Sequence, residues 1–226
     1  MQRSVHAHIL ALLVAGVSLA ASQASPPQDP AALARAIQAK YDTIADFSAD
    51  FVHTYQGGVL RKEATERGTL LIKKPARMRW TYVSPERKVF VADGLRLYSY
   101  IPEDKQVIVS LVPSEDEATT PALFLSGKGS LTRDFTAALP AVPDPLPGTV
   151  TLALTPKRPE PEYDSLVLVV DRGTWRLRKL VTADAQGGRS TFTFTNVREN
   201  VGVSEKEFRF TIPKGVDVIT HGQAAR

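Results

Sequence analysis

The feature that most constrains this chain is a regular alternation of apolar and polar side chains within residues 68–91, GTLLIKKPARMRWTYVSPERKVFV. Successive side chains on a β-strand point to opposite faces, so every second residue shares a face. The large apolar side chains on one face are Leu70, Ile72, Met78, Trp80 and Tyr82. The mostly polar side chains on the other face are Thr69, Lys73, Arg77, Arg79 and Thr81. This pattern predicts an antiparallel sheet with one buried face, and the function depends on what covers that face.

Similar alternation extends over most of the chain. Two of the predicted strands meet at Lys74-Pro75, and a third follows the turn at Ser84-Pro85. The other strands are predicted at residues 47–55, 96–101, 107–112, 149–155, 165–170, 175–181, 191–196 and 207–212. A proline-rich linker, residues 140–148, separates the two runs of strands. A sheet of about eleven strands twists too strongly to stay flat, so we expect it to curl towards a barrel.

Helices are predicted at three places. Asp29-Pro30 is a typical helix start, and apolar residues then recur at three- and four-residue spacing, which predicts an amphipathic helix over residues 30–44. Short apolar helices are expected at residues 122–125 and from Ser130 through Phe135. Such helices need an apolar surface to dock on, and the sheet face provides one. The fold class expected is therefore mainly β with an α-helical lid, although helices of this kind more often pack on an ordinary core.

The first 24 residues have the features of a secretory signal peptide. Arg3 precedes an apolar run, residues 9–19, and Ser22-Gln23-Ala24 fits the small-x-small pattern that signal peptidase cleaves. A buried N-terminal helix is the alternative, but the prolines of residues 25–30 would interrupt it. We therefore predict an exported protein with one mature domain, residues 25–226.

The composition narrows the possible function classes. The chain has no cysteine, so it can form no disulfide and lacks the residue that carries a bacterial lipid anchor. Its 28 Lys and Arg residues against 24 Asp and Glu residues make it only mildly basic. The charges of Arg77 and Arg79 also point away from the aromatic face, whereas a nucleic-acid platform needs both on one surface. Nucleic-acid binding is therefore not expected.

The sequence shows no recognisable catalytic or metal-binding pattern. His53 and His221 are the only histidines of the mature part, and neither has a partner at metal-ligand spacing. A GxSxG nucleophile motif is missing, and Gly127 to Ser130 lacks the spacing of a phosphate-binding loop. We therefore predict no enzyme activity, no metal and no cofactor.

Several short motifs follow one another along nearly the whole mature chain. They are Lys40-Tyr41, Phe47-Ser-Ala-Asp-Phe51, Gly68-x-Leu70-x-Ile72-Lys-Lys-Pro75-x-x-Met78-Arg-Trp80, Pro85, Asp93-Gly94-x-x-Leu97-x-x-Tyr100-x-Pro102, Thr120-Pro121 and Phe208-x-Phe210-x-x-Pro213-x-Gly215-Val-Asp-Val218. In this order the motifs resemble one known family, the periplasmic outer-membrane lipoprotein carriers of the LolA family.

The resemblance implies an unclosed β-barrel whose helical lid covers a hydrophobic cavity for the acyl chains of lipoproteins. The positions expected to line this cavity are Phe47, Phe51, Leu70, Ile72, Met78, Trp80, Phe90 and Leu97. The expected lid residues are Leu33, Ile37, Leu123 and Phe124. Lys74 stands where the family typically has an arginine that latches the lid, and a lysine latch would be less directional because it lacks the planar guanidinium.

The resemblance also implies partners and a compartment. Such carriers are periplasmic, and they take acylated lipoproteins from an inner-membrane ABC-type release complex to an outer-membrane receptor. We expect a monomer with no nucleotide of its own. The main alternative is a periplasmic lipid-binding or sensor module on the same scaffold, with free lipid or glycolipid as its ligand. Catalysis involving His53 is a remote third possibility.

Overall fold

One curved sheet dominates the computed structural model, which describes residues 29–57, 63–112, 125–127, 129–160 and 163–221. The strands of its first half are β1 (Asp46–Gln56), β2 (Glu63–Lys73), β3 (Arg77–Ser84), β4 (Lys88–Asp93), β5 (Arg96–Ile101) and β6 (Gln106–Leu111). Those of its second half are β7 (Phe135–Ala138), β8 (Thr149–Pro156), β9 (Ser165–Asp171), β10 (Leu177–Ala183), β11 (Arg189–Glu199) and β12 (Asp217–Thr220).

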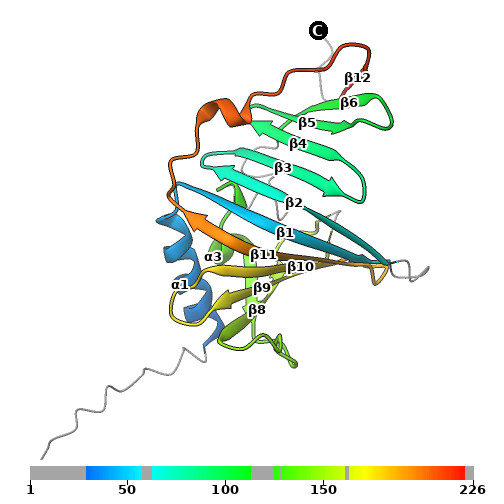
Figure 1. Cartoon of the computed structure of the whole chain (residues 1–226). Helices are drawn as coiled ribbons and strands as arrows, with labels where there is room; N and C mark the ends of the chain where they lie inside the picture. Colours follow the sequence, from blue (N-terminus) through cyan, green and yellow to red (C-terminus); the bar gives the residue numbers. More distant parts are fainter. Residues whose placement is uncertain (1–28, 58–62, 113–124, 128, 161–162, 222–226) are drawn as a thin grey trace, which may run out of the picture.

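The sheet is unclosed. Its twelve strands follow the order β12-β6-β5-β4-β3-β2-β1-β11-β10-β9-β8-β7, so β12 and β7 form its two edges. Neighbours pair antiparallel except β12, which runs parallel to β6. Figure 1 shows the sheet curving around the side on which the helices lie. The predicted fold class, a mainly β curled sheet with few helices, is confirmed.

The helix α1 (Pro30–Asp42) begins and ends at well-defined caps. The Asp29 carboxylate accepts hydrogen bonds from the backbone N–H groups of Ala31 and Ala32, at 3.0 and 3.1 Å. At the other end, the Thr43 N–H and hydroxyl both donate to the Lys40 carbonyl. The helix therefore ends two residues before the predicted boundary, and Ile44 is buried just beyond it. The helix α1 lies on the inner side of the sheet, beside the short helix α3 (Leu131–Asp134), and its buried residues are Leu33, Ala34 and Ile37.

Cross-strand register confirms the alternation predicted around Pro75. Leu70 on β2 lies opposite Trp80 on β3, which in turn lies opposite Phe90 on β4. Leu70 and Trp80 are buried and Phe90 is partly buried, whereas sequence neighbours such as Arg79 and Thr81 lie on the outer face. The sheet therefore has a continuous apolar inner face.

The strand predicted at residues 207–212 is wrong. Residues Glu205–Phe208 form a 3-10 helix, η1, and the following residues are extended but pair with no strand. The guanidinium of Arg79 donates to the carbonyls of Glu207 and Arg209, at 2.6 and 3.3 Å, and so takes the place of a strand partner. Phe208 is buried, and Phe210 stacks on Tyr98, so the segment packs its alternating side chains without joining the sheet.

Two strands were not predicted from the sequence. β7 precedes the proline-rich linker, within a region where only a short helix was expected. β12 lies in the C-terminal segment, and its backbone is held by bonds from Asp217 N–H to the Lys105 carbonyl and from His221 N–H to the Val109 carbonyl. With the misassigned segment removed and these two added, the strand count becomes twelve, and the all-antiparallel expectation fails only at β12.

Some predictions fall on residues that are not described. The leader, residues 1–24, and the predicted helix residues 122–124 lie outside the described residues. None of the described helices is long and apolar enough to cross a bilayer.

Candidate functional site

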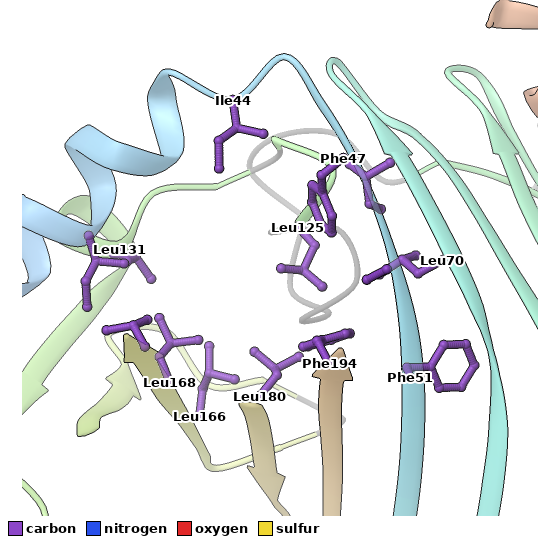
Figure 2. Packing of buried hydrophobic residues seen from close by; sticks show 14 of the residues in the cluster. Ile44, Phe47, Phe51, Leu70, Leu125, Leu131, Leu166, Leu168, Leu180 and Phe194 are labelled. Carbon is purple, nitrogen blue, oxygen red and sulfur yellow. The ribbon is translucent and has the colours of Figure 1, made fainter. Parts of the chain in front are cut away.

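The candidate site is the apolar interior between the sheet and the helices. Side chains from β1, β2, β9, β10 and β11 point towards a shared interior that Leu125, Leu131 and Ile44 close from the other side (Figure 2). Leu125, Leu131 and Leu70 are each fully buried. The interior therefore has a sheet wall and a separate helical cover.

The structure brings together most of the predicted cavity residues. Phe47, Phe51, Leu70, Ile72, Met78 and Trp80 are buried members of one core cluster. Phe90 and Leu97 are only partly buried and pack against its margin. The predicted lid residues Leu33 and Ile37 belong to the same cluster, whereas Leu123 and Phe124 lie outside the described residues.

The prediction missed the second half of the wall. Its buried side chains are Leu152, Leu154, Leu166, Leu168, Leu180 and Phe194. Their two-residue spacing was visible in the sequence, and it was assigned to strands but not to the cavity. The pairing of Phe51 with Phe194 across β1 and β11 places these strands beside the predicted ones.

One pocket among the described residues lies in this interior, where α1 meets β9–β11. Its volume is about 30 Å³, and its lining includes Ile37, Tyr41, Leu125, Leu168 and Leu177. Such a volume has room for water but not for an acyl chain, since ligand pockets typically measure about 300–1,000 Å³. An acyl chain can therefore enter this pocket only if the cover moves.

Lys74 joins the end of α1 to the turn between β2 and β3. Its ammonium donates a hydrogen bond to the Tyr41 carbonyl in the last turn of α1 and lies 3.7 Å from the centre of the Tyr41 ring. The Tyr41 hydroxyl donates to the Leu125 carbonyl, and the Ala76 N–H donates to the Ser126 carbonyl at 2.9 Å. The position identified as a latch thus contacts the cover directly, although its role as a latch remains a prediction.

The segment that carries Leu125 packs so closely against the Lys74 side chain that position 127 requires a glycine. Gly127 has a φ of +85°, and a Cβ on it would lie 2.9 Å from the Lys74 side chain. A larger residue would therefore be strained and would push the lysine stem away. The segment that carries Leu125 is held against Lys74 by shape as well as by hydrogen bonds.

Two further polar contacts tie α1 to its surroundings. Lys40 forms an ion pair with Glu199 of β11, with 2.6 Å between Nζ and Oε2. The side chain of Gln38 accepts a hydrogen bond from the Leu131 N–H at 2.8 Å. The buried side chains of α1 are by contrast the apolar Leu33, Ala34 and Ile37.

Burial changes the pKa of both Lys74 and Tyr41. Burial lowers the pKa of Lys74 to about 8, against a smaller opposing effect of the Asp42 charge. Burial also raises the pKa of the Tyr41 phenol well above its ordinary value. Burial thus shifts both groups towards their neutral forms, although Lys74 with a pKa of about 8 stays mostly protonated at neutral pH.

The inner face of the sheet becomes polar towards the C-terminal end of β1, which is the end farther from α1. There His53 Nδ1 lies 3.0 Å from Glu66 Oε2, and its Nε2 lies 3.3 Å from Ser190 Oγ. Lys88 also binds the Glu66 carboxylate. Burial lowers the pKa of His53, opposed by its bond to Glu66. Burial would raise the pKa of Glu66, but its bonds from Lys88 and His53 outweigh this and lower the pKa.

The contacts of Ser190, His53 and Glu66 do not form an equipped catalytic site. A Ser-His-acid arrangement needs N–H donors for the oxyanion as well as a proton relay. Ser190 instead lies within β11, which is paired on both sides with Tyr55 and Thr182 opposite it, so its backbone belongs to the sheet ladder. Among the described residues, no group of three His, Cys, Asp or Glu side chains could hold a metal ion.

Comparison with known proteins identifies the family. The family model described as "Outer membrane lipoprotein carrier protein LolA" matches residues 42–211. A carrier of this name from Chromohalobacter salexigens is 33% identical over 192 residues, covering 84% of this chain and 87% of the relative. Another from Hahella chejuensis is 32% identical over 206 residues, covering 90% and 95%. The chain belongs to the LolA family.

The LolA family model covers most of the site but not all of it. Its range includes every predicted wall residue and Lys74, but it begins at the last residue of α1. A solved structure of an uncharacterized conserved protein from Thermus thermophilus has a TM-score of 0.53 at 14% identity, covering 84% of this chain and 99% of that chain. That likeness shows the fold alone.

Proposed function

We propose that this LolA-family chain is a carrier that shields the acyl chains of lipoproteins in the interior between its sheet and its helical cover. The observation that carries the proposal is the separation of wall and cover. A continuous apolar sheet face is closed by α1 and by residues around Leu125, and these are tied to the sheet by a few polar contacts at Lys74, Lys40 and Gln38. Family membership supports this reading over a lipid sensor.

Loading requires the cover to exchange places with the cargo. Leu33, Ile37 and Leu125 occupy the wall in the closed state, and acyl chains would replace them with similar apolar contacts. Each buried methylene is worth about 0.8 kcal/mol, so cargo chains gain about as much from the wall as they lose on leaving a membrane. Two packings of similar free energy let small changes load or release the cargo.

The partners and compartment follow from the same proposal. The cargo comes from an inner-membrane ABC-type release complex and passes to an outer-membrane lipoprotein receptor. The predicted signal peptide, residues 1–24, directs the chain to the periplasm, where it acts as a monomer without cofactor or enzyme activity.

A matched pair of substitutions on β2 tests the carrier function. Leu70 is fully buried on the inner face of the wall, whereas its neighbour Thr69 is exposed. A glutamate at Leu70 would place a charge among apolar side chains, which is costly without a partner. We expect Leu70→Glu to lose lipoproteins that co-purify from the periplasm, as seen by native mass spectrometry, and Thr69→Glu to retain them.

Circular dichroism of both variants checks that the sheet is intact. Intact acylated lipoproteins bound to wild type and to Thr69→Glu support the carrier. Free lipid alone would instead favour the lipid-binding module, and equal loading of both variants would contradict the placement of the cargo against the inner face of the sheet.

A further inference from the structure

One polar group inside the apolar wall, the indole N–H of Trp80, has no hydrogen-bond partner among the described residues. Trp80 is only 5% exposed, yet among the residues that the structure describes its indole Nε1–H finds no hydrogen-bond acceptor. A buried donor left unpaired is costly, and native proteins retain few of them. Such a group in a binding wall calls for an explanation.

The surroundings of Trp80 define what could accept this hydrogen bond. Its ring meets the rings of Phe51 and Phe192 edge to face, with centroids 5.1 and 5.2 Å apart. Leu70 and Phe90 lie directly opposite it on the neighbouring strands. Because these neighbours are apolar, a charged acceptor such as phosphate or carboxylate would lose its hydration without compensation. The fitting acceptor is a neutral oxygen attached to an apolar group.

The position of Trp80 along the sheet points to the same chemistry. Successive rows of inner-face side chains change from apolar near α1, at Phe47 and Ile72, to the charged contacts of His53, Glu66 and Lys88. Trp80 lies between these ends. A cargo whose hydrocarbon chain fills the α1 end and whose polar end meets the charged cluster would place its linking carbonyl beside the indole.

We infer that Trp80 Nε1–H binds the ester or amide carbonyl that joins an acyl chain to the cargo. This inference rests on the proposed carrier function and assigns the wall a directional contact with the cargo. In the closed state the donor is unpaired, whereas the loaded state pairs it. The contact therefore favours acylated molecules over hydrocarbon of the same length and favours loading over closure.

Two synthetic lipopeptides test this contact. One carries two ester-linked saturated chains, and the other carries the same chains through ether linkages, which lack the carbonyl. Wild-type protein should bind the ester form on the order of tenfold more tightly, because the ether leaves the donor without its carbonyl acceptor. Equal affinities would overturn the inference.

The indole proton gives a direct readout. The chain has two tryptophans, so ¹⁵N labelling yields two indole signals, and Trp175→Phe assigns the signal of Trp80. We expect this signal to move downfield with the ester lipopeptide and to move far less with the ether form. An upfield signal that ignores both ligands would show that the N–H points at an aromatic ring, which also overturns the inference.

An isosteric replacement separates the hydrogen bond from packing. Benzothienylalanine in place of Trp80, introduced in the Trp175→Phe background, keeps the ring shape but has no N–H. It should bind ester and ether forms equally, with ether affinity unchanged from the Trp175→Phe parent. A preference for the ester that survives this replacement contradicts the inference. If wild type binds neither lipopeptide, the carrier function itself fails.

Discussion

At the scale of single residues, Lys74 couples the cover to the sheet through a group that is poorly solvated. Its ammonium reaches the Tyr41 carbonyl and the Tyr41 ring, but burial lowers its pKa to about 8. The unfolded chain holds this proton up to the ordinary value of 10.5, so it binds more protons than the folded chain between pH 8 and 10.5. Linkage then requires the free energy of unfolding to rise with pH across this window.

This yields a prediction for how the contribution of Lys74 to stability depends on pH. The contribution of Lys74 to the closed packing should be greatest above pH 10.5 and should decrease as the pH falls to about 8. We expect the difference in free energy of unfolding between wild type and Lys74→Met, measured by urea titration from pH 7 to 9.5, to change in favour of wild type as the pH rises. The upper limit avoids ionisation of tyrosines, whose ordinary pKa is about 10.

Lys74→Arg is the control for this experiment, because arginine stays protonated throughout the range. Its difference from Lys74→Met should not depend on pH. If the difference in free energy of unfolding between wild type and Lys74→Met is also independent of pH, Lys74 is as well solvated in the folded protein as in the unfolded chain.

At the scale of elements, α1 has to pack well enough to close the interior and loosely enough to leave it. Its buried residues are Leu33, Ala34 and Ile37, and its polar ties lie at its C-terminal half. A helix of 13 residues has little stability by itself in water, so its packing on the sheet maintains it. Weakening this packing should therefore shift the balance between closed and loaded states.

Leu33→Ala tests that balance. Leu33 is fully buried, so its truncation should lower the free energy of unfolding of the empty protein by about 2–5 kcal/mol, measured in urea. The same change should tighten binding of an acylated lipopeptide, because it destabilises the closed state with which the cargo competes.

Arg35→Ala is the matched control on the exposed face of the same helix, and it should change the free energy of unfolding by no more than about 0.5 kcal/mol. Weaker lipopeptide binding by Leu33→Ala would mean that Leu33 contacts the cargo instead of competing with it.

At the scale of the whole molecule, an unclosed sheet separates a stable wall from a replaceable cover. β1 and β11 pair along nearly their whole length at the middle of the sheet, while the two edges stay apart. The backbone ladder holds the wall without any contribution from α1 (Figure 1). We therefore expect that the interior can open without loss of the sheet.

Hydrogen exchange measured by mass spectrometry tests this division. Adding an acylated lipopeptide should speed the exchange of amides in α1, residues 30–42, while the amides of β1 and β11 stay protected. The same peptide without acyl chains is the control and should change neither. Loss of protection across the sheet on loading would contradict a rigid wall, and unchanged α1 would contradict a moving cover.

Much of the wall could be predicted from the sequence, but less of the cover could. Leu70 and Trp80 share a face because strand alternation is local, and the Asp29 cap of α1 is also read from adjacent residues. The segment after Glu205 shows the same alternation as a strand, yet Arg79 binds its carbonyls and keeps it outside the sheet. Pattern alone does not show which partner a backbone group will take.

By itself, the sequence determined which side chains form the inner face, where the first helix begins and which family the motifs resemble. These depend on spacing along the chain. Only the tertiary structure decided that Lys74 reaches the Tyr41 carbonyl, that β12 pairs parallel with β6, and that the Trp80 N–H is buried without a partner among the described residues. Such features depend on groups that are distant in sequence and meet only when the sheet curves.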